Sequence, residues 1–290
     1  MPRPRRVYLH VGLDDGSGDV VDAALGHHAH ALLDLGVRRA AATGEESFRA
    51  ALDAVGCHRE HGYARDDVAG AWARQARRAR KGRDTIVVSA PLLAAADPAR
   101  AAQVVESFRG FEVHALLTVR APDLWTPADD PARDLPSVLA RWTAAVRRPE
   151  RTHVLVCDDD PTATWRAVGR TCGFGTASLA VAGLVPVRPA LLPPAWGVAS
   201  GHDRGQRWAE LLTGSDVDVV GDPAALARRP ADPADPALRP EQQLAAAARA
   251  LDDARRDTDR LRRRAEELER RLGKADAKRR KLKRRLVEAG

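Results

Sequence analysis

The stretch from Val7 to Leu25, VYLHVGLDDGSGDVVDAAL, has the layout of a phosphate-binding strand, loop and helix. It begins as an apolar strand, passes through a loop rich in glycine and continues as a helical pattern. In such a loop, backbone N–H groups and the positive end of the helix dipole hold an anion. The small residues suited to this task are Gly12, Gly16, Ser17 and Gly18. The spacing therefore predicts an anion-binding geometry after the first strand.

The charge of the same loop opposes a polyphosphate. Asp14, Asp15 and Asp19 place three carboxylates at the mouth of the loop, and each close like-charge contact disfavours an anion by about 1 kcal/mol or more. The lysine of a phosphate loop is absent, and the single lysine of residues 1–240, Lys81, ends a basic helical pattern. The residues are equally explained by a tight turn in which Asp19 caps the next helix.

Two histidine groups are candidate metal sites. In HHAH (27–30), His27 and His30 lie one helical turn apart, and CHREH (57–61) brings a cysteine near two histidines. Neither group has a fourth ligand at a spacing typical of zinc. Solvated or partly buried histidines are therefore favoured, and we expect no metal.

Polar residues in or directly after the apolar strand patterns could be ligands or could have a structural role. The acidic run CDDDPT (157–162) follows a strand, so its carboxylates could bind Mg²⁺. A helix N-cap explains the run equally well. His114 and His153 lie inside apolar strand patterns, where hydrogen-bonded core histidines are more common than ligands.

The elements that must position these residues alternate along the chain. Apolar, β-branched runs predict buried strands at 6–12, 84–90, 112–120 and 152–158. Residues 215–222 are either a short strand or a buried helix end. Helical patterns occupy 19–36, 65–82, 97–110, 135–148 and 160–175. This alternation predicts an α/β fold with a mainly parallel, doubly wound sheet flanked by helices. The proline-rich segment from about 176 to 240 is expected to be otherwise irregular.

The first strand and loop resemble those of the sulfotransferase-like P-loop proteins of actinobacteria. That family opens with a motif of the form hhGxPKTGTTxLQ, and HVGLDDGSGDVVD (10–22) keeps Gly12 and the spacing. Laid on the motif, the chain has Asp14 at the proline, Asp15 at the lysine and Asp19 at the last threonine.

Further motifs extend this resemblance over most of 6–227. TIVVSAPLLAAADPARA (85–101) is similar to the family's viSxELLa segment and keeps its serine as Ser89, with Pro91 at the acidic position. EVHALLTVRAPDL (112–124) is similar to hhLhlTvRDLa and keeps Arg120. Ala128 stands near the serine that usually follows. THVLVCDDDPTATWRAVGRTCGFG (152–175) and DVDVVGDPAAL (216–226) are similar to the later strands and helix.

The resemblance implies a P-loop-type fold and a nucleotide cofactor, 3′-phosphoadenosine 5′-phosphosulfate, in active relatives. It assigns a vestigial cofactor site to Gly12, Gly16, Ser17, Gly18 and Arg120, with Arg120 approaching the 3′-phosphate. A lysine and loop hydroxyls would stabilise charge on the transferred sulfuryl group, and Asp15 reverses the sign. We therefore expect a binding or scaffold module that needs no cofactor and has no catalytic residue. The alternatives are an active sulfotransferase and a protein that binds polyanions through its C-terminal segment.

The cysteine spacing and the length of the apolar runs limit the cellular compartments in which the protein is expected. Cys57, Cys157 and Cys172 show no CxxC spacing, which favours a reducing cytosol and a cytoplasmic protein. Because the sequence lacks an uninterrupted apolar run of about 18 residues, we expect no membrane span.

The C-terminal segment differs from the rest in charge. Residues 241–290 hold 17 basic and 10 acidic side chains, so they carry the whole net charge of +7, while residues 1–240 hold 30 of each sign. Seven of the eight residues 278–285 are basic and none is aromatic. Contact with nucleic acid or another anionic surface would therefore be of the backbone type, without base stacking.

A heptad pattern follows a proline-rich linker at 228–240. Leucine, alanine, Thr258 and Arg279 occupy the a and d positions of 244–286, which predicts a coiled coil and a homo-oligomer. A single helix with i,i+4 ion pairs is the alternative. The predicted organisation is an α/β domain at 1–227, the linker at 228–240 and a basic coiled-coil helix at 241–290.

Overall fold

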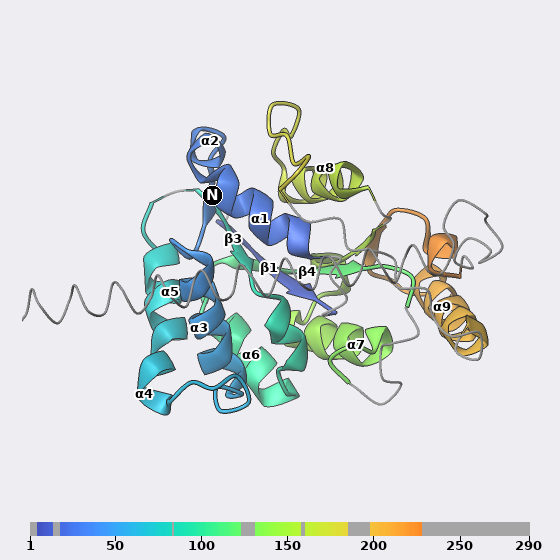
Figure 1. Ribbon diagram of the computed structural model, residues 1–290, viewed down its shortest axis with the longest axis horizontal. Helices are drawn as coiled ribbons and strands as arrows, with labels where there is room; N and C mark the ends of the chain where they lie inside the picture. The colour runs from blue at the N-terminus through green and yellow to red at the C-terminus, as the bar shows by residue number, and fades with distance from the viewer. Residues whose placement is uncertain are drawn as a thin grey trace, which may run out of the picture. The chain divides into compact units, whose positions relative to one another are not determined.

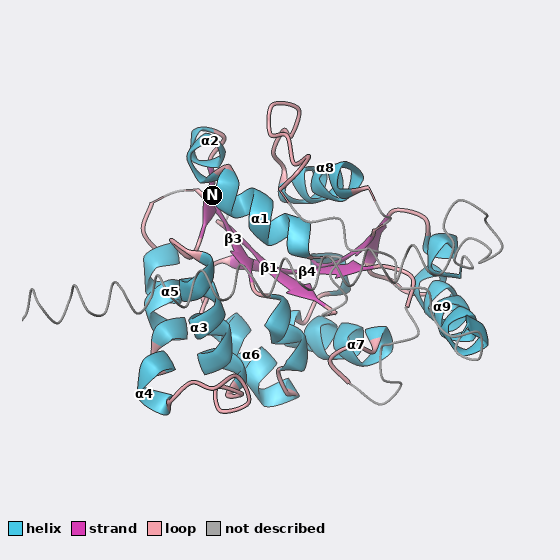
Figure 2. Cartoon of the chain, viewed as in Figure 1, coloured by secondary structure: helices cyan, strands magenta, loops and turns pink. Residues whose placement is uncertain are grey.

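The computed structural model describes residues 5–13, 18–82, 84–122, 131–157, 160–184 and 198–227. Within these ranges, six strands form one sheet in the order β2-β3-β1-β4-β5-β6, and every pair is parallel (Figure 2). The strands are β1 (Arg6–Gly12), β2 (Val37–Arg39), β3 (Thr85–Ser89), β4 (Glu112–Val119), β5 (Thr152–Val156) and β6 (Asp218–Val220). The predicted α/β class with a parallel sheet is confirmed.

Helices flank the sheet on both faces, as Figure 1 shows. α1, α2 and α8 cover one face, and α3, α5, α6 and α7 cover the other. The helices are α1 (Asp19–His27), α2 (Ala29–Asp34), α3 (Gly44–Val55), α4 (Arg65–Val68), α5 (Ala71–Ala79), α6 (Pro98–Glu106), α7 (Leu135–Val146), α8 (Pro161–Cys172) and α9 (Val198–Thr213). Short 3₁₀ turns are η1 (Pro91–Ala95), η2 (Pro149–Arg151) and η3 (Pro223–Ala227).

The strands supply two cores because their side chains alternate between the faces. In β1, Val7, Leu9 and Val11 face the α3–α7 side, where the indole of Trp142 is fully buried. Tyr8 faces the α1–α8 side together with the apolar residues of those helices. Since both faces are covered, the strands read as the nearly continuous apolar runs from which they were predicted.

Aspartate side chains cap the starts of α6 and α8. The carboxylate of Asp97 accepts the backbone N–H of Arg100 at 2.8 Å, and Asp160 accepts that of Thr162 at 2.8 Å. α1 is different: its N-cap is Gly18, which offers no side-chain bond, and Asp19 is already the first helical residue. The predicted cap by Asp19 is therefore wrong, and the N-cap alternative for the acidic run 157–162 is met by Asp160.

Two predicted helices are each divided in the structure. The 19–36 pattern breaks at His28, whose backbone leaves helical geometry (φ −96°, ψ 19°) and whose Nε2 lies 2.8 Å from the carbonyl oxygen of Ala180. The 65–82 pattern breaks at Gly70, which has a φ of +71° that side-chain-bearing residues rarely adopt. A tertiary hydrogen bond and a backbone reversal thus interrupt otherwise regular periodicity.

The expectation of an irregular segment from 176 to 240 is wrong for α9. This helix buries Trp208 and Leu212 in the core on the α7 side, so a few apolar residues suffice to dock it. Of the two alternatives for 215–222, the short strand is present, as β6. The linker at 228–240 and the coiled coil at 241–290 lie outside the described residues, and the described elements belong to one compact unit.

Candidate functional site

The carboxyl end of β1 is the point where the chain direction changes across the sheet. β1 leads into α1 on one face, whereas its neighbours β3 and β4 lead into α6 and α7 on the other face (Figure 1). In open parallel sheets, ligands bind in the crevice that such a divergence leaves. Gly12 and Gly18 flank this edge, while Gly16 and Ser17 lie outside the described residues.

Three polar side chains meet just below this edge. His10 in β1 contacts Ser89 at the end of β3 and Thr118 in β4. His10 Nδ1 lies 3.0 Å from Ser89 Oγ, and His10 Nε2 lies 3.1 Å from Thr118 Oγ1. The three side chains are 0%, 3% and 0% exposed. The parallel register therefore builds a buried hydroxyl–imidazole–hydroxyl cluster at the switch point.

The cluster is polar but uncharged. Complete burial lowers the pKa of His10 to about 4, because the charged form loses its hydration. A neutral imidazole has one N–H donor and one acceptor nitrogen. One hydroxyl therefore accepts a hydrogen bond from His10, and the other donates one to it. At neutral pH the base of the site offers no positive charge to an anion.

The start of α1 presses directly on this cluster. A Cβ atom added to Gly18 would lie 2.8 Å from His10 Cε1 and 3.2 Å from Thr118 Oγ1. A Cβ at Gly12 would lie 3.1 Å from Pro91 Cβ. Both predicted site glycines thus have a packing role, because backbone and side chains approach closely there.

Carboxylates occupy the positive end of α1. Asp19 and Asp22 lie in its first turn, where negative charge is favourable to the helix dipole. Asp22 Oδ1 lies 2.7 Å from Nη2 of Arg39, a side chain that is only 8% exposed. Arg39 is therefore neutralised by a carboxylate of the same helix. Arg120 follows β4 at this edge and is partly buried, whereas Lys81 lies between α5 and β3, at the opposite edge.

These residues do not fit the sulfonucleotide that the resemblance implies. A polyphosphate at the start of α1 would meet the carboxylate of Asp19 and the ion pair of Asp22 with Arg39, above a neutral His10. Arg120 lies at this edge of the sheet, but one guanidinium does not replace the lysine and hydroxyls of a phosphate loop. Among the described residues, the geometry keeps the place of an anion site and lacks its charge.

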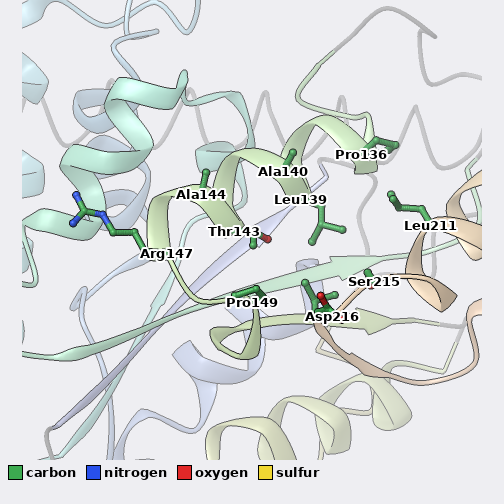
Figure 3. A pocket seen from close by; sticks show the side chains of 11 residues that line it. Pro136, Leu139, Ala140, Thr143, Ala144, Arg147, Pro149, Leu211, Ser215 and Asp216 are labelled. Carbon is green, nitrogen blue, oxygen red and sulfur yellow. The ribbon is translucent and has the colours of Figure 1, made fainter.

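A groove of about 560 Å³ lies elsewhere, between α7 and the segment that leads into β6 (Figure 3). Leu139 and Leu211 give it an apolar lining, and few polar groups converge in it. Its lining residues are Pro136, Leu139, Ala140, Thr143, Ala144, Arg147, Pro149, Leu211, Ser215, Asp216 and Val217. We place the candidate site at the carboxyl edge because polar side chains and the topological switch coincide there.

The histidines predicted from the sequence have varied surroundings. Among the described residues, no three histidine, cysteine or acidic side chains gather to hold a metal ion. His61 packs edge-on against the ring of Phe48, and His27 against that of His28. His114 and His153 are buried and hydrogen-bonded to each other at 2.8 Å, which confirms the core interpretation.

Sequence reasoning missed His10 and Thr118 as site residues. The readable signal was a polar residue inside each apolar strand pattern, RVYLHVG and EVHALLTVR. The partners could not be chosen, because His10 and Thr118 are 108 residues apart and only strand register brings them together.

Comparisons with protein-family models, with curated proteins and with solved structures found no match. Across the described ranges, none of the helices is both long and apolar enough to span a membrane.

Proposed function

We propose that the α/β domain is a sulfotransferase-like, P-loop-type domain that has lost sulfuryl transfer and works as a binding or scaffold module. The observation that carries the loss of activity is the buried, neutral His10 beneath a helix whose first turn holds two carboxylates. Sulfuryl transfer, like phosphoryl transfer, requires donors and cations aimed at developing negative charge. A site without such positive charge disfavours both the cofactor and the transition state.

The placement of the motif residues supports the sulfotransferase-like part. Gly12, Ser89 and Arg120 come from three separate motifs of the resemblance. In the structure they end, or directly follow, β1, β3 and β4, which are neighbours in the sheet. A site that keeps the layout of the family motifs and changes their charge is what a binding module derived from such an enzyme would have.

The test is a calorimetric titration of the full-length chain with adenosine 3′,5′-bisphosphate, together with a turnover assay with 3′-phosphoadenosine 5′-phosphosulfate and a phenolic acceptor. We expect a Kd weaker than about 1 mM and no turnover. The double substitution Asp15→Lys and Asp19→Thr should tighten nucleotide binding at least tenfold, because it restores attraction at the loop.

The matched control is the double substitution Asp34→Lys and Asp66→Thr, which makes the same charge change on α2 and α4, away from the candidate site. This control should leave nucleotide affinity unchanged. Tight binding by the unmodified chain, lost on replacement of Arg120 by Ala, would instead favour an active sulfotransferase.

The charge distribution favours a second candidate, polyanion binding through 278–285. Any such affinity should reside in residues 241–290, since they carry the whole positive excess. The full chain should bind DNA or anionic vesicles with a steep salt dependence, about 0.9 log units per phosphate contacted on B-DNA. Neutralising Lys278, Arg279, Arg280 and Lys281 should reduce binding more than neutralising Arg262, Arg263, Arg264 and Arg271.

Sedimentation of the full chain and of 1–240 tests the predicted homo-oligomer through 244–286 in the same samples. If the truncation keeps both the mass and the polyanion affinity of the full chain, the segment has neither role.

A further inference from the structure

A line of hydrogen bonds crosses β4, β5 and β6 at the amino end of the sheet. Glu112 Oε1 lies 2.9 Å from His114 Nε2, and His114 Nδ1 lies 2.8 Å from His153 Nε2. His153 Nδ1 then lies 2.7 Å from Asp218 Oδ2. The two histidines are 7% and 8% exposed. Four titratable side chains thus form one line with three contacts, and the candidate site uses none of them.

Each of these contacts requires one proton between its two heavy atoms. Ionised carboxylates supply none, and each neutral imidazole supplies one. The ordinary forms of the four groups therefore hold two protons for three contacts. If both imidazole protons face the carboxylates, two nitrogen lone pairs meet at 2.8 Å in the central contact. That arrangement is repulsive, and the short contact indicates a third proton.

We propose that His114 and His153 share one additional proton at neutral pH and that this proton fastens the edge strand β6 to the sheet. His114 is neutral, donating from Nε2 to Glu112 and accepting at Nδ1. His153 is an imidazolium that donates from Nε2 to His114 and from Nδ1 to Asp218. All three contacts are then satisfied, and the charge of the imidazolium lies beside a carboxylate.

The surroundings of the pair agree with this distribution. Burial, together with the neighbouring His153, lowers the pKa of His114, which keeps His114 the neutral acceptor. On β1, the Tyr8 ring stacks on His114 with centroids 4.7 Å apart, and burial raises the pKa of its phenol. On α8, burial likewise raises the pKa of the Cys172 thiol. Both groups therefore stay uncharged at neutral pH.

The charged neighbours act on the carboxylate at the β4 end. Arg6 Nε lies 3.5 Å from Glu112 Oε1. The pKa of Glu112 falls below its usual range, because burial raises it less than the His114 hydrogen bond and the positive charges of Arg151 and Arg6 lower it. Glu112 therefore remains an ionised acceptor. Asp218, whose side chain is 51% exposed, gives the line a route for proton exchange with solvent.

The hydrogen bonds of this line are weakened both when the pH rises and when it falls. Loss of the third proton at high pH leaves two lone pairs facing each other, and a fourth proton at low pH leaves two N–H groups facing each other. β6 has three residues and pairs with β5 through Asp218↔His153, Val219↔Val154 and Val220↔Leu155. The β6 edge, and the adjoining residues 215–217 that line the groove in Figure 3, are therefore held most firmly at intermediate pH.

The direct test is side-chain NMR of the full-length chain labelled with ¹⁵N in histidine. At pH 7 we expect a ¹⁵N–¹⁵N coupling across the central hydrogen bond and one ring in the imidazolium form. Asp218→Asn should lower the pH at which the coupling disappears by at least about one unit, because it removes the stabilising negative charge. The control Asp216→Asn makes the same charge change at an exposed side chain two residues away and should have no effect.

Two results would overturn the proposal: both rings neutral at pH 7 without coupling, or identical titrations for Asp218→Asn and Asp216→Asn. A coupling that appears only with added Zn²⁺, or is lost with a chelator, would also contradict it, because the shared species would be a metal. The unmodified chain suffices for these measurements if a variant fails to fold.

Amide hydrogen exchange tests whether the shared proton stabilises the pairing of β6 with β5. After correction for intrinsic rates, the amide of Val220, which the register turns toward β5, should exchange most slowly near neutral pH and about tenfold faster on either side, the size expected for one charge-assisted hydrogen bond. Leu9 of β1 is the internal reference. Equal pH profiles for Leu9 and Val220 would show that the histidines do not fasten β6.

Discussion

Two buried histidine clusters lie on the α1–α8 face of the same sheet, and they differ in the groups that hold them. His10 lies between two hydroxyls at the carboxyl end, and His114 with His153 lies between two carboxylates at the amino end. Burial disfavours charge at both. A hydroxyl can donate or accept, so two hydroxyls complete the hydrogen bonds of a neutral imidazole. Carboxylates only accept, so a pair of neutral histidines between two carboxylates has two protons for three hydrogen bonds. The partners, more than the burial, decide which cluster is charged.

The largest expected effect concerns acid stability at His10. Its pKa is about 4 in the folded chain and about 6.5 when unfolded, so the unfolded state binds more protons between these values. Stability must then fall as the pH drops through this window. Lowering the pH from 7 to 4.5 should remove about 2–3 kcal/mol through His10 alone. Urea unfolding at both pH values measures the loss, which should shrink in His10→Gln.

The control for this prediction is His30→Gln, which replaces an exposed histidine and should retain the full loss. Equal losses in the two variants would mean that His10 is protonated in the folded state near pH 6, and the contrast between the clusters would disappear.

The next effect concerns the packing of the start of α1 on the His10 cluster. Gly18→Ala should destabilise the fold by about 1–3 kcal/mol, since its Cβ would lie 2.8 Å from His10 Cε1. Gly175→Ala makes the same change where no atom lies within 4 Å of the added Cβ, and it should be nearly neutral. Thermal unfolding of both variants measures the difference. A Gly18→Ala variant as stable as Gly175→Ala would show that α1 does not press on the cluster.

The smallest effect isolates one hydrogen bond. Thr118 and Thr152 are both fully buried in the sheet, but only the Thr118 hydroxyl contacts a histidine. Among the described residues, the Thr152 hydroxyl has no hydrogen-bond partner. Thr118→Val should cost about 1–2 kcal/mol, whereas Thr152→Val should be neutral or stabilising. Chemical denaturation of both variants gives the comparison, which fails if the two changes have the same sign and size.

Local sequence patterns predicted the principal strands because both faces of the sheet are covered. β1, β3, β4 and β5 lie within their predicted ranges. The three-residue β2 is too short to show a period. α3 was missed although a Thr-x-x-Glu pattern marks its start. Thr43 Oγ1 accepts the N–H of Glu46 at 3.1 Å, and Glu46 Oε2 accepts the N–H of Ala42, one residue before the N-cap, at 2.9 Å.

The candidate site could be predicted only in part. Gly12, Ser89 and Arg120 were named from motifs, and the structure brings them to neighbouring strand ends. The role of His10 could not be read from its own segment, because its partners are 79 and 108 residues away. No local pattern states which strands will be neighbours, or in what register.

The sequence by itself determined the α/β class, the buried strands and the concentration of positive charge in residues 241–290. These features depend on local periodicity and on counts, which need no knowledge of distant neighbours. The tertiary structure alone decided which polar side chains meet. The parallel register gave His10 two hydroxyls, and gave His114 and His153 two carboxylates and each other. Proton affinity inside a protein depends on such neighbours, so the chemistry of each histidine was fixed only when the strands paired.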